Sequence, residues 1–300
     1  MEVPTGFIEA EANGFFIVTR PVYHKLAVDL AAADPEKVLA GAHAPAGAME
    51  GRGARLELPG EGGDVLILKK QRRGGLYAKL RGDIHRDDYH AVSEVILSET
   101  AWKKGVPVAL MAFALSAPAG AGRLASHRRA YSASIKLRGA RSLMDWLTDP
   151  TVTGSGRRAV LRAAAHAVNR AHDRGFEHGD LNLGNILVVK SEQGDHTGWL
   201  IDLAHSKLGG TLRPGPRVRN LVRLYRSAEK WLPAATPQEI RRRGRDVVFF
   251  LRAYSGREKG QVRRLLAEAR RSSASLFLHR LGWKVTRSAG VRRSSAPAGR

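Results

Sequence analysis

The sequence predicts an α+β fold of two lobes, a strand-rich lobe followed by a mainly helical one. The apolar run that begins residues 65–70 predicts a strand, and apolar residues recur with the period of a helix in residues 157–174. The chain has 300 residues, enough for two lobes on either side of one cleft. We therefore expect a strand-rich lobe over residues 1–137, a helical lobe over 138–283, and a basic disordered tail over 284–300.

A glycine-rich turn precedes the first predicted hairpin of the strand-rich lobe. Gly51 and Gly53 stand before this hairpin, which covers residues 56–63. Glycine lets backbone N–H groups approach a phosphate closely, although glycines also mark ordinary turns. The turn gains significance because it lies one hairpin before a strand that ends in two lysines.

That strand places Lys69 and Lys70 on opposite faces of the sheet. Either lysine is a candidate phosphate ligand, and the alternative is that both end the strand in solvent. The predicted helix over residues 89–104 carries Glu94 and Glu99. Five residues of helix turn through about 500°, so these carboxylates point about 140° apart and only one can face the lysine. We select Glu94 as that partner, with a solvent-facing carboxylate as the alternative.

The next segment leads from one lobe to the other. Residues 114–122 consist mostly of Ser, Pro, Gly and Ala and predict a loop. Residues 130–137 predict a strand, and residues 138–141 a turn between the lobes. The first helix of the second lobe is expected to begin in residues 142–147.

A helix, a polar loop and a hairpin follow in that order. The helix over residues 157–174 is followed directly by a glycine, which suits a helix end. The loop covers residues 178–184, and the β-branched apolar run 186–189 predicts a buried strand. The returning strand over residues 199–201 ends at Asp202, so the hairpin brings this carboxylate back beside the loop.

The loop and hairpin hold residues suited to phosphoryl transfer. Asp180 can accept the proton of an attacking hydroxyl, while Asn185 and Asp202 offer oxygen ligands of the kind that Mg²⁺ prefers. The alternative is an ordinary polar turn whose aspartates cap the backbone, but the order of helix, loop, hairpin and terminal aspartate favours a catalytic site. His178 either braces the loop or acts directly in the chemistry.

At these residues the sequence resembles the lipopolysaccharide core kinases, the family of Kdo kinases and heptose kinases with a protein-kinase-like fold. The resemblance covers residues from about 51 to 231. It is carried by residues 51–53, 65–76, 105–108, 178–189, 199–203 and 217–227. The strings Arg-Arg-Gly-Gly-Leu at 72–76 and Asp-Leu-Asn-x-x-Asn-Ile-Leu at 180–187 are fairly specific to this group among kinase-like proteins.

The resemblance implies an enzyme that uses ATP and Mg²⁺ to phosphorylate a sugar hydroxyl, on Kdo or heptose, of the lipopolysaccharide inner core. It implies Asp180 as the catalytic base and Asn185 and Asp202 as magnesium ligands. It also implies Lys69 as the phosphate ligand and Glu94 as its partner. The site of action would be the cytoplasmic face of the inner membrane.

The sequence departs from the family's pattern at two places, which leave the identity of the acceptor sugar less certain than the reaction. The family's usual Ile-Asp-Phe-Asp is Ile-Asp-Leu-Ala at residues 201–204, so the second aspartate is missing. Lys69 and Lys70 stand where the Kdo kinases tend to have Arg-His. Kdo and heptose therefore both remain open as the acceptor.

The charge of the chain predicts an anionic partner. Lysine and arginine total 50 against 28 acidic residues, a formal net charge of +22. Nucleic acid, an anionic membrane surface and an acidic glycolipid are the three candidates, and the resemblance favours the last two together. The helix predicted over residues 217–231 has a basic face that is either simply solvated or binds glycolipid phosphate.

Several classes of protein are disfavoured by what the sequence lacks. The chain has no cysteine, which excludes disulfides, thiolate chemistry and cysteine zinc sites. The first residues include three glutamates and no long apolar run, so we predict no signal peptide. No apolar run approaches the roughly 20 residues that span a bilayer. We expect a cytoplasmic protein, soluble or peripheral at the inner membrane.

Two other functions compete with a sugar kinase. An atypical, RIO-like protein kinase also uses a His-x-Asp loop, but the sequence after Asp202 lacks an Ala-Pro-Glu segment. A non-catalytic basic scaffold that binds nucleic acid is the second alternative. It is disfavoured because no recognition motif is found and all the catalytic residue types are present.

Overall fold

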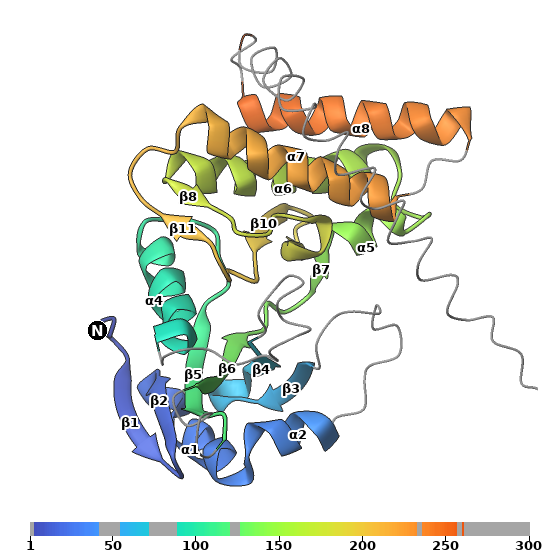
Figure 1. Cartoon of the computed structure of the whole chain (residues 1–300). Helices are drawn as coiled ribbons and strands as arrows, with labels where there is room; N and C mark the ends of the chain where they lie inside the picture. The colour runs from blue at the N-terminus through green and yellow to red at the C-terminus, as the bar shows by residue number, and fades with distance from the viewer. Residues whose placement is uncertain are drawn as a thin grey trace, which may run out of the picture.

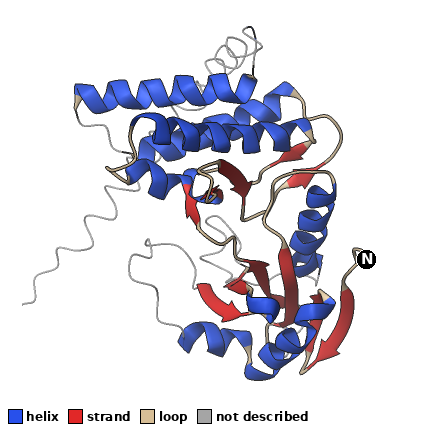
Figure 2. Cartoon of the chain, turned by 180° about the vertical axis from the view of Figure 1, so that it is seen from behind, coloured by secondary structure: helices blue, strands red, loops and turns tan. Residues whose placement is uncertain are grey.

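The computed structural model describes residues 3–41, 55–71, 89–120, 127–232, 236–256 and 260. In Figure 1 a sheet with its covering helices occupies the lower half of the molecule, and a stack of helices occupies the upper half. Figure 2 shows the same division from behind. The α+β fold of two lobes predicted from the sequence is confirmed.

The lower lobe is built on a six-stranded sheet in the order β1-β2-β5-β6-β4-β3. Every neighbouring pair is antiparallel. The strands are β1 (Ile8–Ala12), β2 (Phe15–Thr19), β3 (Arg55–Pro59), β4 (Val65–Lys70), β5 (Met111–Pro118) and β6 (Arg128–Ile135). A short helical turn, η2 (Glu61–Gly63), closes the β3–β4 hairpin.

Helices cover both faces of this sheet. After the turn η1 (Pro21–Tyr23), α1 (His24–Ala33) and α2 (Pro35–Gly41) lie on one face, where their apolar residues pack with Leu66 and Leu68 of β4. On the other face α4 (Tyr89–Lys103) packs Val95 against Met111 of β5. Because successive residues of a strand point to opposite faces, Lys69 faces α4 and Lys70 faces α2.

The prediction of a loop over residues 114–122 is wrong for most of its length. Residues 114–118 belong to β5, an interior strand paired with both β2 and β6. Ala114, Leu115 and Ser116 are at most 1% exposed. Small side chains favour loops only where the chain is solvated, whereas here they fit a strand covered by helices on both faces. Composition alone does not reveal that coverage.

The upper lobe packs helices against a small sheet. The helices are α5 (Leu143–Thr148), α6 (Gly154–Asp173), α7 (Pro214–Trp231) and α8 (Pro237–Ser255), with the turn η4 (Leu183–Asn185). The strands are β7 (Ala140–Ser142), β8 (Phe176–Glu177), β9 (Ile186–Lys190), β10 (His196–Leu200) and β11 (Lys207–Leu208). The helices and hairpin predicted over residues 157–174, 186–201 and 217–231 are confirmed, with their ends shifted by a few residues.

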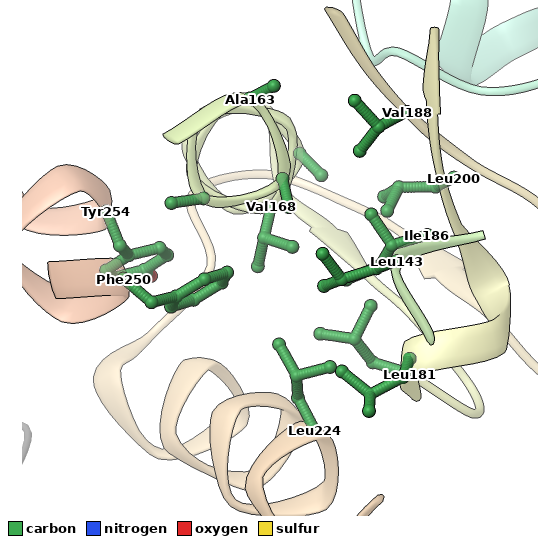
Figure 3. Packing of buried hydrophobic residues seen from close by; sticks show 14 of the residues in the cluster. Leu143, Ala163, Val168, Leu181, Ile186, Val188, Leu200, Leu224, Phe250 and Tyr254 are labelled. Atoms are coloured by element: carbon green, nitrogen blue, oxygen red, sulfur yellow. The ribbon is translucent and has the colours of Figure 1, made fainter. Parts of the chain in front are cut away.

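Helix α6 is the centre of this lobe. In Figure 3 Val168 of α6 lies between Phe250 of α8 and the apolar side chains of the β9–β10 hairpin, Ile186 and Leu200. The hairpin approaches the helix so closely that a Cβ on Gly198 would lie 2.5 Å from the Ala163 carbonyl oxygen. This packing fixes both ends of the segment that runs from the loop after α6 to Asp202.

Direct contacts join the two lobes beside α4. The backbone at Val108 forms a parallel bridge with Leu200. The indole rings of Trp102 on α4 and Trp199 on β10 stack with their centroids 5.7 Å apart and 14° between their planes. Of the helices in the described ranges, none combines the length and the apolar character that crossing a bilayer requires.

Candidate active site

A lysine and two carboxylates meet where the lobes face each other. The Nζ atom of Lys69 on β4 lies 3.0 Å from Glu94 Oε1 on α4 and 3.0 Å from Asp202 Oδ1, just after β10. Burial lowers the pKa of Lys69, but the two carboxylates outweigh it and leave the pKa above its ordinary value. Burial raises the pKa of Asp202, and the Lys69 ammonium reverses this effect, so the Asp202 carboxyl is ionised near neutral pH.

Glu94 is held in one orientation by two further donors. Its Oε2 atom accepts from Gln71 Nε2 at 3.0 Å and from Ser132 Oγ at 3.2 Å. The glutamate is only 5% exposed, so these bonds compensate for the loss of hydration. The fixed carboxylate in turn fixes the Lys69 ammonium.

The structure decides which lysine and which glutamate belong to this group, a choice that the sequence left open. Lys70 points away from this group and pairs with Glu36 of α2 at 2.6 Å. Glu99 pairs with Arg20 at 2.6 Å. Lys69 and Glu94 are therefore the lysine and the glutamate that come together with Asp202.

Asp180 lies in the loop after α6 and is open to solvent. Its side chain is 68% exposed, and its carboxylate accepts from Asn182 Nδ2 at 3.0 Å. Its carbonyl oxygen accepts from Asn185 Nδ2 at 2.9 Å. Because this bond uses the amide nitrogen of Asn185, the Oδ1 atom is the part of that side chain left for a metal ion. Asn185 is also linked to the Asp202 end of the hairpin, since its carbonyl accepts from Ile201 N at 3.0 Å.

His178 connects the Asp180 loop with the Asp202 segment. Its Nε2 atom lies 3.0 Å from the Ile201 carbonyl oxygen, and its Nδ1 accepts from Asp180 N at 3.1 Å. These partners require a neutral ring protonated on Nε2. Burial lowers the pKa of His178, which favours the neutral form. The contacts fit the bracing role that the sequence left open for this histidine.

The backbone around Asp202 is close to the loop and unusual in conformation. Asp202 has φ +62°, a left-handed value uncommon for residues other than glycine. The chain then returns as β11, which pairs with β8 immediately before His178. A Cβ on Gly179 would lie 2.3 Å from the Ala204 carbonyl oxygen. Only glycine therefore permits this approach of the two segments.

Helix α7 supports the loop through polar side chains that the sequence analysis missed. Asn220 accepts from the backbone N–H of His178 at 3.0 Å and donates to its carbonyl oxygen at 2.8 Å. Ser227, two helical turns further on, accepts from the backbone N–H of Leu183 at 3.1 Å. The sequence held a signal for these contacts, because polar residues recur at helical spacing among the apolar residues of this helix. The sequence analysis considered only the basic face of the helix.

A buried network extends from Asn220 to α8. The Asn220 Oδ1 atom also lies 3.1 Å from His172 Nε2, and His172 Nδ1 lies 2.8 Å from the Tyr254 hydroxyl. Since Asn220 Oδ1 is an acceptor, His172 donates from Nε2 and accepts the Tyr254 proton on Nδ1. Burial lowers the pKa of His172 to about 4, so the ring is neutral at pH 7. These three side chains tie α6, α7 and α8 to the loop.

Two predicted site residues, Gly51 and Gly53, lie outside the described residues. Among the residues that the structure does describe, no three His, Asp or Glu side chains are grouped so as to hold a metal ion by themselves. Asn185 and Asp202 are only two residues, so a metal bound by them would take its remaining ligands from phosphates and water.

Comparisons with known proteins identify the family of the chain. A family model described as the lipopolysaccharide kinase (Kdo/WaaP) family matches residues 52–254. A 3-deoxy-D-manno-octulosonic acid kinase of Haemophilus influenzae (strain PittEE) is 30% identical over 190 residues, which cover 61% of this chain and 75% of the relative. The protein of the same name from Stenotrophomonas maltophilia (strain R551-3) is 31% identical over 197 residues, 63% of this chain and 70% of the relative.

A solved structure has the same fold. The chain described as "WaaP in complex with acyl carrier protein" aligns with 87% of this chain and 99% of its own length, with a TM-score of 0.52. Its sequence identity is 20%, so the likeness concerns the fold.

Proposed function

Because the chain belongs to the lipopolysaccharide kinase (Kdo/WaaP) family, we propose that it transfers the γ-phosphate of ATP to a sugar hydroxyl of the lipopolysaccharide inner core. The curated relatives carry the name of a Kdo kinase. Kdo is therefore the first acceptor to test, and heptose is the second. The family match favours neither a protein substrate nor a non-catalytic scaffold for nucleic acid.

One observation carries the proposal. Lys69, paired with the buried Glu94, also pairs with Asp202, while His178 and Asn185 connect the Asp202 segment to the loop of Asp180. The arrangement brings together a cation for phosphates, oxygen ligands for a metal and an exposed carboxylate for a hydroxyl. Phosphoryl transfer requires mainly positioning and neutralisation of charge, and these groups provide both.

In the proposed reaction the acceptor hydroxyl oxygen bonds to the γ-phosphorus of ATP. The bond from that phosphorus to the bridging oxygen breaks, and ADP leaves. The hydroxyl proton passes to the Asp180 carboxylate, which the solvent-exposed position of this side chain allows. Lys69 binds the phosphates of the nucleotide, and Glu94 keeps its ammonium in place.

Asn185 and Asp202 fit a magnesium ion. Both offer hard oxygen ligands, and Asp202 is ionised because Lys69 holds its pKa below the ordinary value. Bound Mg²⁺ would neutralise phosphate charge during transfer. When a nucleotide is present, its phosphates replace Asp202 as the partner of Lys69, which leaves the Asp202 carboxylate for the metal.

The variant Asp180→Asn tests the proposal. Since it removes the base without changing the size of the side chain, kcat should fall about 10²- to 10⁴-fold with the KM for ATP unchanged. The assay is mass spectrometry of a Kdo-bearing core glycolipid incubated with the chain and ATP, with a gain of one phosphate as the readout. Asp195→Asn, in the exposed turn of the β9–β10 hairpin, is the control and should retain wild-type turnover. If Asp180→Asn keeps wild-type turnover, Asp180 is not the base. If the wild type transfers phosphate to neither a Kdo nor a heptose acceptor, the proposed function is wrong.

The acceptor chemistry also suggests a location. A lipid-linked acceptor and a net charge of +22 favour a peripheral position on an anionic membrane surface, on the side where ATP is present. We therefore propose the cytoplasmic face of the inner membrane as the working site.

A further inference from the structure

An arginine lies beside the proposed catalytic base. The Nε atom of Arg223 on α7 is 4.0 Å from Asp180 Oδ1, and its Nη1 donates to the Gly179 carbonyl oxygen. Both side chains of the pair face solvent, at 49% exposure for Arg223 and 68% for Asp180. The backbone contact holds the guanidinium next to the position where an acceptor hydroxyl must approach the base.

Stability does not explain this arrangement. An exposed ion pair at 4.0 Å contributes little to folding, because water screens the charges and both side chains lose freedom. The support of the loop is already provided by the buried contacts of Asn220 and a partly buried one from Ser227, on the same helix. A group that is exposed and weakly paired beside a catalytic carboxylate is placed to meet a ligand.

The charges around Arg223 indicate which ligand it meets. Lys69 Nζ lies 3.0 Å from Asp202 Oδ1, on the nucleotide side of the proposed site. Arg223 Nε instead lies 4.0 Å from Asp180 Oδ1, the proposed base. In an in-line transfer the attacking and leaving oxygens lie on opposite sides of the phosphorus. Arg223 therefore stands with the acceptor, and Lys69 stands with the nucleotide.

We propose that Arg223 binds a carboxylate carried by the acceptor sugar, which makes it a specificity-determining residue. The inference rests on the proposed sugar-kinase function and narrows its substrate to a sugar acid. Arginine presents a planar fork of N–H groups that matches a carboxylate, and the described residues occupy only the Nη1 side of this fork with a hydrogen bond. Without this cation, the sugar carboxylate would meet the negative Asp180 and the triphosphate and be repelled. A neutral heptose would gain nothing from it.

The test uses the full chain, ATP and two forms of one Kdo-bearing acceptor, with the sugar carboxylate intact or converted to the carboxamide. The wild type should have a KM for the carboxylate form about 10- to 100-fold lower than for the carboxamide. Arg223→Gln keeps an N–H donor for Gly179 but removes the charge. This variant should raise the KM for the carboxylate form to that of the carboxamide, with the KM for ATP unchanged. Arg223→Lys, which keeps the charge without the fork, should fall between the two.

Arg242→Gln on α8 is the matched control, since it removes the same charge from an exposed helix position. It should keep the wild-type preference. The inference is overturned if Arg223→Gln raises the KM for both acceptor forms equally, or if it changes only kcat and the KM for ATP, because the residue would then act on the loop or on the phosphates. Loss of the Arg223 effect with an acceptor lacking lipid phosphates would also overturn it, since the ligand would then be a phosphate.

The failure of this inference can be told apart from failure of the proposed function. A wild type that phosphorylates both acceptor forms with equal KM keeps the kinase function and loses the carboxylate contact. A wild type that phosphorylates neither form, nor a heptose acceptor, overturns both.

Discussion

Glu94 and Glu99 show how two similar residues on one helix acquire different roles. Both are carboxylates on α4, at 5% and 8% exposure, and each pairs with a cation. Glu94 pairs with Lys69, which also contacts Asp202, whereas Glu99 pairs with Arg20, which donates to the Met111 carbonyl. The first pair belongs to the proposed site and the second attaches α4 to its own lobe.

Exchange of these two carboxylates for amides gives a matched test. Glu94→Gln should lower kcat/KM for ATP about 10- to 100-fold, because Lys69 loses the charged partner that positions it. Glu99→Gln should leave kcat/KM for ATP unchanged, although it also removes a partly buried ion pair from the same helix. Steady-state kinetics at varied ATP, with the thermal midpoint of each variant as a check on folding, decides the matter. Equal losses in both variants would show that the effect is general damage to α4.

Gly179 allows a second prediction at the scale of a single residue. In Gly179→Ala the new methyl group would meet the Ala204 carbonyl at 2.3 Å, so the Asp180 loop and the Asp202 segment must separate. We expect the free energy of unfolding to fall by about 1–3 kcal/mol, as for other overpacked sites. Turnover should fall further than stability implies, since the two segments carry the proposed base and a proposed metal ligand.

Gly209→Ala is the control for this change, because a methyl group there meets no atom within 4 Å. Urea denaturation and turnover are measured on both variants. Wild-type turnover in Gly179→Ala would show that the spacing of the two segments does not matter for the chemistry.

At the scale of elements, three helices hold the loop through one polar network. Helix α6 contributes His172, α7 contributes Asn220 and α8 contributes Tyr254, and Asn220 clamps both backbone groups of His178. Each of these side chains has partners, which is the condition for a buried polar network to stabilise a fold. The loop is therefore coupled to the packing of the whole helical lobe.

This network predicts a loss of stability in acid. The folded chain binds a proton at His172 with a pKa of about 4, whereas the unfolded chain does so near 6.5. Between these values the unfolded state binds more protons, so stability is fully present above pH 6.5 and decreases as the pH falls toward 4, by at most about 3 kcal/mol. In His172→Gln the amide can replace the Nε2 donor but does not titrate.

The measurement is the free energy of unfolding in urea at pH 7 and at pH 4.5 for both proteins. The decrease should be smaller in His172→Gln by about 2 kcal/mol, since other titrating groups, including His178, contribute equally to both. An identical decrease would mean that His172 is not the group responsible.

Local sequence patterns predicted some of these elements well and others not at all. The helix–loop–hairpin order from residue 157 to Asp202 depends on periodicity, a helix-ending glycine and β-branched residues, all of which are local. Strand alternation separated Lys69 from Lys70 but could not say which face carries the site, because helices cover both. The face that carries the site is the one covered by α4 rather than by α1 and α2. Which helix covers which face is decided by tertiary packing. The burial of β5 and the contacts of Asn220 were missed for the same reason.

At the scale of the whole molecule, α4 is attached to both lobes. It packs on the sheet through Val95, and its Trp102 stacks on Trp199 of the helical lobe. Glu94 of the same helix pairs with Lys69 of the sheet at 3.0 Å. These contacts hold α4 in one position relative to both lobes. We therefore expect the helix to keep Glu94 beside Lys69 without a large movement during catalysis.

The distribution of charge along the chain gives the last prediction, on how the molecule finds a lipid-linked acceptor. Residues 284–300 contain five basic residues and no acidic one, in a chain of net charge +22. A basic residue near an anionic lipid surface contributes about 1 kcal/mol to binding, and salt screens this attraction. Deletion of residues 284–300 should therefore weaken binding to vesicles that contain anionic lipid at least tenfold at low salt. The difference should shrink as salt is raised, and phosphorylation of a water-soluble acceptor should not change.

Vesicle sedimentation over a salt series measures the effect, with uncharged vesicles as the control. Equal binding of both proteins at low salt would show that the membrane contact lies on the basic surface of the lobes rather than on the C-terminal segment.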